Sequence, residues 1–228
     1  MIKKASYLLV FILLTSVSFA QTIGGSVMLG LPQGEFKEKI DRLGYGFNVQ
    51  GTLWEMSPDR PVTIGANLGY LIYGEESERR SLWADIPGAY VDVNRTNSLV
   101  DFHLMFQVSP FSGPIRPYVE GLFGGAYLFT QTSVESDWSD ENLFESTNFD
   151  DFTWNYGFGG GFLIALVSDP TGVASLFLDL KVRYKYGTEA EYLKEGSIDI
   201  INGDLYYDVQ KSKTDLMTIH IGVTAAIF

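Results

Sequence analysis

Regular alternation of apolar and polar residues is the strongest pattern in this chain, and it is clearest in SLFLDLKVRYKYG, residues 175–187. Every second residue from Leu176 to Tyr186 is apolar or aromatic, and the residues between them include Asp179, Lys181, Arg183 and Lys185. Successive side chains of a β-strand point to opposite faces. The segment is therefore predicted as a strand with one apolar and one charged face.

Similar runs recur along the chain, separated by clusters of Gly, Pro, Asp and Asn. They predict eight strands, at about 22–31, 44–54, 62–73, 97–108, 116–130, 151–166, 173–186 and 215–228. The connections alternate between long ones, 32–43, 74–96, 131–150 and 187–214, and the short ones EMSPDRP, SPFSGPI and SDPTG. Outer-membrane barrels have this asymmetry, with tight periplasmic turns and longer external loops.

Aromatic residues on the apolar faces gather at the strand ends next to the long connections. They are Tyr45, Phe47, Tyr70, Tyr127, Phe129, Trp154, Tyr156, Tyr184 and Tyr186. If the apolar face meets lipid, these rings form a girdle at one membrane interface, where amphipathic aromatic side chains are favoured. A soluble lipocalin-like binder with the faces reversed is the alternative, but it has no need of such a girdle.

The polar faces then point into the barrel. The lumen of an eight-stranded barrel is filled by side chains, so inward charges should be paired. We predict a polar lumen network of Asp101, His103, Glu120, Asp179, Lys181, Arg183, Lys185 and His220.

The N-terminus has the pattern of a secretory signal: Lys3 and Lys4, then LLVFILLTSV, then Ser18-Phe19-Ala20. We expect a signal peptide at 1–20 and one barrel domain at 21–228. The chain has no cysteine, so disulfides cannot stabilise the exported protein. Its net charge of −12 argues against nucleic acid as a partner.

The chain resembles the eight-stranded outer-membrane barrels of the OmpA transmembrane-domain and OmpX type, also described as outer membrane protein β-barrel domains. The resemblance rests on the signal sequence, on strand patterns such as IGANLGYLIYG and VEGLFGGAYLF, and on the terminal LMTIHIGVTAAIF. It implies an all-β fold, an eight-stranded antiparallel up-and-down transmembrane β-barrel. The family's terminal aromatic resembles a signal for the barrel-assembly machinery, yet Phe228 here falls on the polar parity of its strand.

Three patterns suggest other chemistry. The string Gly157-Phe158-Gly159-Gly160-Gly161 resembles a phosphate-binding loop, but it lies inside a predicted strand, where inward glycines make room for bulky lumen groups. A barrel enzyme needs a Ser and an acid beside His103 or His220, and no inward Ser is expected near either at the outer end. The acidic runs in 131–150 and 187–214 do not match the EF-hand spacing and are interpreted as solvated loops.

We assign no catalytic, cofactor-binding or metal-ligating residue. The expected protein is a monomeric, non-enzymatic barrel of the outer membrane of a Gram-negative-type bacterium, with a plugged polar lumen and a structural or surface-interaction role through its loops. Its expected partners are outer-membrane lipid, the barrel-assembly machinery and an extracellular ligand. A narrow porin for small solutes is the first alternative, and a lipid-modifying barrel enzyme is the second.

Overall fold

The computed structural model describes residues 22–81, 90–136, 139–168, 174–194, 197–201 and 204–227. The predicted signal peptide and Phe228 lie outside the described residues. Within these ranges, no helix is long and apolar enough to cross a membrane.

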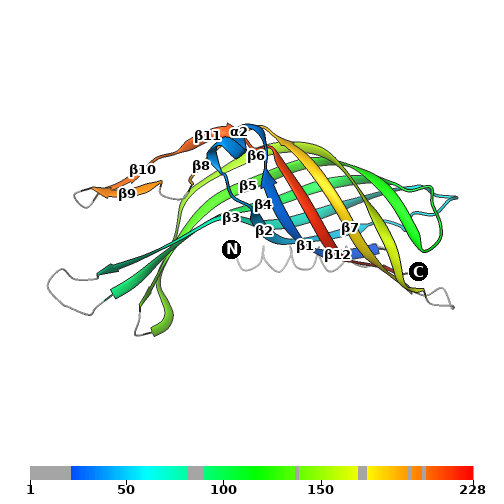
Figure 1. The fold of residues 1–228 in the computed structure, drawn as a ribbon, viewed down its shortest axis with the longest axis horizontal. Helices are drawn as coiled ribbons and strands as arrows, with labels where there is room; N and C mark the ends of the chain where they lie inside the picture. Colours follow the sequence, from blue (N-terminus) through cyan, green and yellow to red (C-terminus); the bar gives the residue numbers. More distant parts are fainter. Residues whose placement is uncertain are drawn as a thin grey trace, which may run out of the picture.

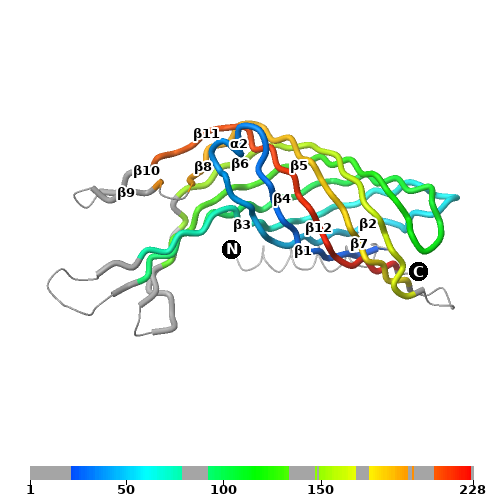
Figure 2. The backbone as a smooth tube through the Cα atoms, viewed as in Figure 1, coloured from blue at the N-terminus to red at the C-terminus, as the bar shows by residue number. Residues whose placement is uncertain are grey.

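Eight antiparallel strands close into a barrel, as the alternation predicts. Each strand pairs with the next one along the chain, and β1 pairs with β12 to close the ring (Figures 1 and 2). The strands are β1 (Thr22–Pro32), β2 (Gly44–Thr52), β3 (Val62–Ser81), β4 (Tyr90–Val108), β5 (Ile115–Ser136), β6 (Ser139–Ser168), β7 (Ala174–Gly187) and β12 (Leu216–Ile227). The structure confirms the predicted fold class and strand number.

The predicted loops 74–96 and 131–150 are wrong in large part, because β3 to β6 run far beyond the barrel wall. Gly74–Ser81 pairs with Tyr90–Asn97, and β5 pairs with β6 as far as Ser136 and Ser139. Beyond the wall, these extensions do not have to separate a lipid face from a lumen face, so they need no apolar alternation, and the ladder itself satisfies the backbone. The two hairpins project together from one end of the barrel, which we call the outer end, and the opposite end is called the inner end (Figure 1).

The other two long connections also contain regular structure. The first carries the short helix α2 (Gly34–Lys39), in the segment GEFKEKIDRLGYG. The predicted loop 187–214 instead holds four short strands, paired as β8 with β11 and β9 with β10. They are β8 (Glu189–Tyr192), β9 (Ile198–Ile201), β10 (Asp204–Tyr207) and β11 (Gln210–Lys213). Figure 1 shows α2, β8 and β11 at the same end as the projecting hairpins.

Burial in the barrel is inverted relative to a water-soluble protein. On the outer wall Leu104 and Val27 are each 66% exposed, whereas inside the barrel Arg183 is 2% exposed. The strand period produces this difference, since one parity of each strand faces outward and the other inward. The polar residues therefore form the interior, and the apolar residues form the outer surface.

Candidate functional site

The cations of β7 lie inside the barrel because β6 offers them space. The register places three inward glycines opposite three cations: Gly157 opposite Lys185, Gly159 opposite Arg183 and Gly161 opposite Lys181. A Cβ atom added at Gly159 would lie 2.9 Å from Glu120 Oε1 and 3.0 Å from Arg183 Cγ. The glycine string therefore packs against long lumen side chains.

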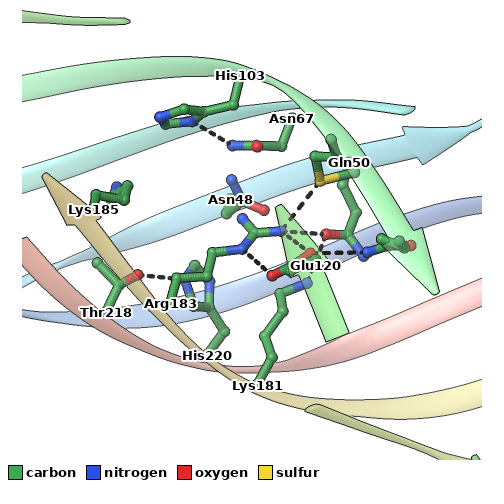
Figure 3. Close-up of polar contacts among 12 residues, drawn as sticks. Asn48, Gln50, Asn67, His103, Glu120, Lys181, Arg183, Lys185, Thr218 and His220 are labelled. Carbon is green, nitrogen blue, oxygen red and sulfur yellow. Dashed lines mark hydrogen bonds and ion pairs between the residues drawn. The ribbon is translucent and has the colours of Figure 1, made fainter. Parts of the chain in front are cut away.

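Arg183 forms the centre of the lumen network (Figure 3). Its Nε donates to Glu120 Oε1 at 2.6 Å, and its Nη2 donates to Glu120 Oε2 at 3.2 Å and to Gln50 Oε1 at 3.1 Å. Gln107 donates a further hydrogen bond of 2.9 Å to Glu120 Oε2. Such a two-point contact between guanidinium and carboxylate is stronger and more directional than a single ion pair.

A second ion pair joins Lys181 to Asp179, at 2.8 Å between Nζ and Oδ2. Lys181 also donates to Gln50 Oε1 at 2.6 Å, which links this pair to Arg183. The Tyr118 hydroxyl donates to Asp179 Oδ1 at 2.7 Å. All the polar groups of this layer therefore have partners, as buried charges require.

A third pair, Lys185 with Asp101, lies toward the outer end. His103 Nδ1 lies 3.6 Å from Asp101 Oδ1, and its Nε2 lies 2.5 Å from Asn155 Oδ1, which accepts a hydrogen bond from it. Asn67 donates to the same Asp101 oxygen at 3.4 Å. The eight residues of the predicted lumen network are thus all buried inside the barrel, and six of them form three ion pairs.

His220 lies beside Ser26, a neighbour that the sequence analysis missed. Its Nε2 lies 2.9 Å from Thr218 Oγ1, and its Nδ1 lies 3.3 Å from Ser26 Oγ. Within the described residues no carboxylate forms an ion pair with His220. A serine beside a histidine without an orienting acid lacks the third member of a catalytic triad.

An apolar cluster lies across the outer end of the lumen. Phe36 of α2 is fully buried, and its ring packs edge-to-face on Tyr73 at 5.9 Å and on Tyr192 at 5.1 Å between centroids. Burial raises the pKa of Tyr192, whose hydroxyl lies 2.6 Å from Ser212 Oγ. Leucines from the barrel wall complete the cluster: Leu71, Leu99, Leu128 and Leu216.

The connection between β2 and β3 lies across the inner end. Trp54 Nε1 donates to the Val62 carbonyl at 2.5 Å, and Glu55 forms an ion pair with Arg116. The Arg116 guanidinium lies 4.7 Å from the centroid of the Phe177 ring, which suits a cation–π contact. These groups line a small cavity of about 30 Å³.

The nine predicted girdle residues all lie on the outer wall, exposed or half-buried. Several pack in pairs across neighbouring strands, such as Phe47 with Tyr70 at 5.6 Å and Tyr156 with Tyr186 at 5.5 Å between ring centroids. Further exposed aromatics continue along the wall, so the rings are not confined to one end: Phe102, Phe106, Phe123, Phe158 and Phe162. The outer wall is therefore rich in aromatic residues along its length.

Several polar partners of the network were not predicted as site residues. Gln50, Tyr118 and Asn155 all lie on inward parities, which is the signal that could have identified them. Much of the acidic run after Ser136 lies outside the residues with described side chains. In the part that is described, no group of three or more His, Cys, Asp or Glu could hold a metal ion.

The described geometry defines a class of architecture: a closed eight-stranded antiparallel barrel with an apolar wall and a charged interior. No family model and no curated protein matches the chain. It is similar to solved structures of outer-membrane barrels, including Neisserial surface protein A, at 12% identity over 91% of this chain and 96% of that one, with a TM-score of 0.42. Ail of Yersinia pestis has 12% identity over 90% and 95%, with a TM-score of 0.39.

The N-terminal barrel domain of OprF from Pseudomonas aeruginosa is another similar structure, at 10% identity over 90% of this chain and 98% of that one, with a TM-score of 0.33. The fold itself follows from the strand pairing of this chain, which closes eight antiparallel strands into a barrel.

Proposed function

We propose that this protein is a monomeric β-barrel of the outer membrane of a Gram-negative-type bacterium, with a closed lumen and a non-enzymatic role that is structural or acts through its external loops. The inverted burial carries the proposal. An apolar wall that includes Leu104 at 66% and Phe123 at 61% exposure suits lipid, whereas in water it would favour aggregation. A closed barrel also leaves no unpaired strand edge in the hydrocarbon region.

The closed lumen is supported by what lies along the barrel axis. Three buried ion pairs occupy the middle, Phe36 lies at the outer end, and Trp54 and Arg116 lie at the inner end. The inner cavity of about 30 Å³ corresponds to roughly one water molecule. A continuous water path, which a narrow porin needs, would require these groups to move.

The external role is supported by the amount of structure above the wall. The β3–β4 and β5–β6 hairpins and the β8–β11 segment all stand at one end (Figure 1). Structured loops on a rigid barrel are suited to binding, because the scaffold holds them in place. Outer-membrane lipid, the barrel-assembly machinery and an extracellular ligand are the partners that this role implies.

The test is to refold residues 21–228 into detergent and into liposomes. Folding is scored by a heat-dependent shift in gel mobility, and conduction by planar-bilayer recording on the same sample. We expect a heat-dependent gel shift without steady conductance. A gel shift together with steady conductance would favour the porin alternative over the closed barrel. A stable fold without detergent would refute the membrane assignment.

An enzyme assay separates the remaining alternative. Phospholipid analogues incubated with the refolded protein should stay intact, since no carboxylate forms an ion pair with His220 in the described part of the chain and Ser26 beside it therefore lacks an orienting acid. Turnover that is lost in Ser26→Ala would contradict the non-enzymatic role.

A further inference from the structure

A recess with a basic lining opens at the outer end of the barrel, beside the apolar cluster. Its volume is about 190 Å³, equivalent to roughly six water molecules. Among the described residues, three cations line it, Lys39, Arg42 and Lys194, together with one carboxylate, Asp41. The lining therefore has a net positive charge in a protein whose overall charge is −12.

The three cations come from two segments, Lys39 and Arg42 from the connection between β1 and β2 and Lys194 from the connection after β8. Lys39 ends α2, where a basic residue also favours the helix dipole. That explanation does not extend to Lys194, which follows β8 and is half-buried. Neither Lys39 nor Lys194 forms an ion pair within the described residues, so both ammonium groups are available to an anion.

One residue of the recess lining carries an unsatisfied donor. The Tyr73 hydroxyl, on a side chain that is 2% exposed, lacks a hydrogen-bond partner among the described residues, and Tyr73 lines the recess. Leaving a buried donor unpaired costs about 1–3 kcal/mol, so such groups call for an explanation.

We propose that this recess binds a phosphate or sulfate group, held by Lys39 and Lys194 and by a hydrogen bond from the Tyr73 hydroxyl. Tetrahedral oxyanions accept several hydrogen bonds and favour sites with more than one cation. The group can belong to a lipid headgroup or to a soluble anion. The inference rests on the proposed function for its outward orientation.

The primary test is titration of the refolded full mature chain with inorganic phosphate in a non-ionic detergent, with isothermal titration calorimetry as the readout. Lys39→Gln combined with Lys194→Gln should raise the Kd at least about tenfold, because hydrogen bonds from charged donors are lost. The matched control is Lys37→Gln, which removes the same charge from the same helix but lies outside the recess. It should change the Kd less than twofold.

A second variant protects the test against misfolding. Tyr73→Phe removes only an unpartnered hydroxyl, so the urea midpoint without phosphate should stay unchanged or rise, while phosphate binding weakens about tenfold. A hydroxyl that matters only for packing would instead change the midpoint and leave binding intact, and the proposal would be wrong.

Two membrane-mimetic environments distinguish the sources of the anion. In a non-ionic detergent without phosphate groups the wild-type chain should bind phosphate; weaker binding in nanodiscs of phosphatidylcholine, whose zwitterionic headgroup carries a phosphate, would assign the recess to a lipid headgroup, and equal binding to a soluble anion. The proposal would be overturned if wild type and the double lysine variant bound phosphate equally tightly. It would also be overturned if wild type that shows the heat-dependent gel shift, and is therefore folded, bound no phosphate. A chain without a heat shift would refute the membrane barrel, and the same titration in water would still decide the recess.

Discussion

The contact between Arg183 and Glu120 offers the sharpest test of the lumen. Arg183→Met would remove two hydrogen bonds to Glu120 and one to Gln50. The Glu120 carboxylate would keep the hydrogen bond from Gln107. Both side chains are almost completely buried, at 2% and 0% exposure. Breaking one side of a buried pair costs about 3–5 kcal/mol, mainly because the remaining charge is uncompensated.

The matched double variant tests this explanation. Glu120→Met alone should cost about as much as Arg183→Met, but the double variant leaves no orphaned charge. Replacing a whole buried pair with apolar residues is often nearly neutral. The coupling energy from the double-mutant cycle should therefore be about 3 kcal/mol or more.

The free energies come from urea unfolding of the refolded barrel in detergent, with gel mobility and tryptophan fluorescence as independent probes. The exposed pair Lys211–Glu189, at 3.6 Å and about 60% exposure, is the control, and Lys211→Met should change stability by less than about 0.5 kcal/mol. The buried network would be refuted if the losses in unfolding free energy of the two single variants added up to that of the double variant. It would also be refuted if either single variant lost as little stability as the Lys211→Met control.

Three further changes test other parts of the barrel. Gly159→Ala should lower the urea midpoint, because its Cβ would lie 2.7 Å from the Val182 carbonyl oxygen, whereas Gly25→Ala, with no atom within 4 Å, should leave it unchanged. Leu104→Arg on the outer wall should cost about 2–4 kcal/mol if it lies near the bilayer midplane, and Val209→Arg in the external segment should not impair insertion; equal insertion of both variants would argue against a lipid-facing wall. Phe36→Ala should destabilise the outer cluster by about 3–5 kcal/mol, and an unchanged unfolding midpoint would show that α2 does not stabilise the barrel.

The sequence predicted the barrel well because one physical constraint acts on every strand. A charged residue that faces lipid raises the free energy of the folded barrel, so the apolar–polar period of two is visible in each segment that crosses the wall. Asp101 and Arg183 could be placed inside for this reason. Their partners could not, because Arg183 of β7 meets Glu120 of β5 over Gly159 of the intervening β6, and alternation alone carries no information about which inward groups meet.

The same constraint explains the errors beyond the wall. Residues 74–81 and 90–97 pair as strands that do not have to separate lipid from lumen, so no apolar period marks them. The segment after Gly187 was predicted as one loop although Ala190 and Tyr192 belong to the same buried cluster as Phe36. Two apolar residues in the four-residue strand β8 are too few for a period to appear.

The division between wall and mouth also indicates where specificity can arise. Inside the wall, each charge of the three ion pairs has a partner, so those groups contribute stability and have little capacity left for a ligand. At the outer mouth, by contrast, Lys39 and Lys194 line a recess together with Tyr73, whose hydroxyl has no partner in the described part of the chain. Polar groups without partners are the ones that gain most from an incoming anion, so recognition should depend on the mouth and stability on the lumen.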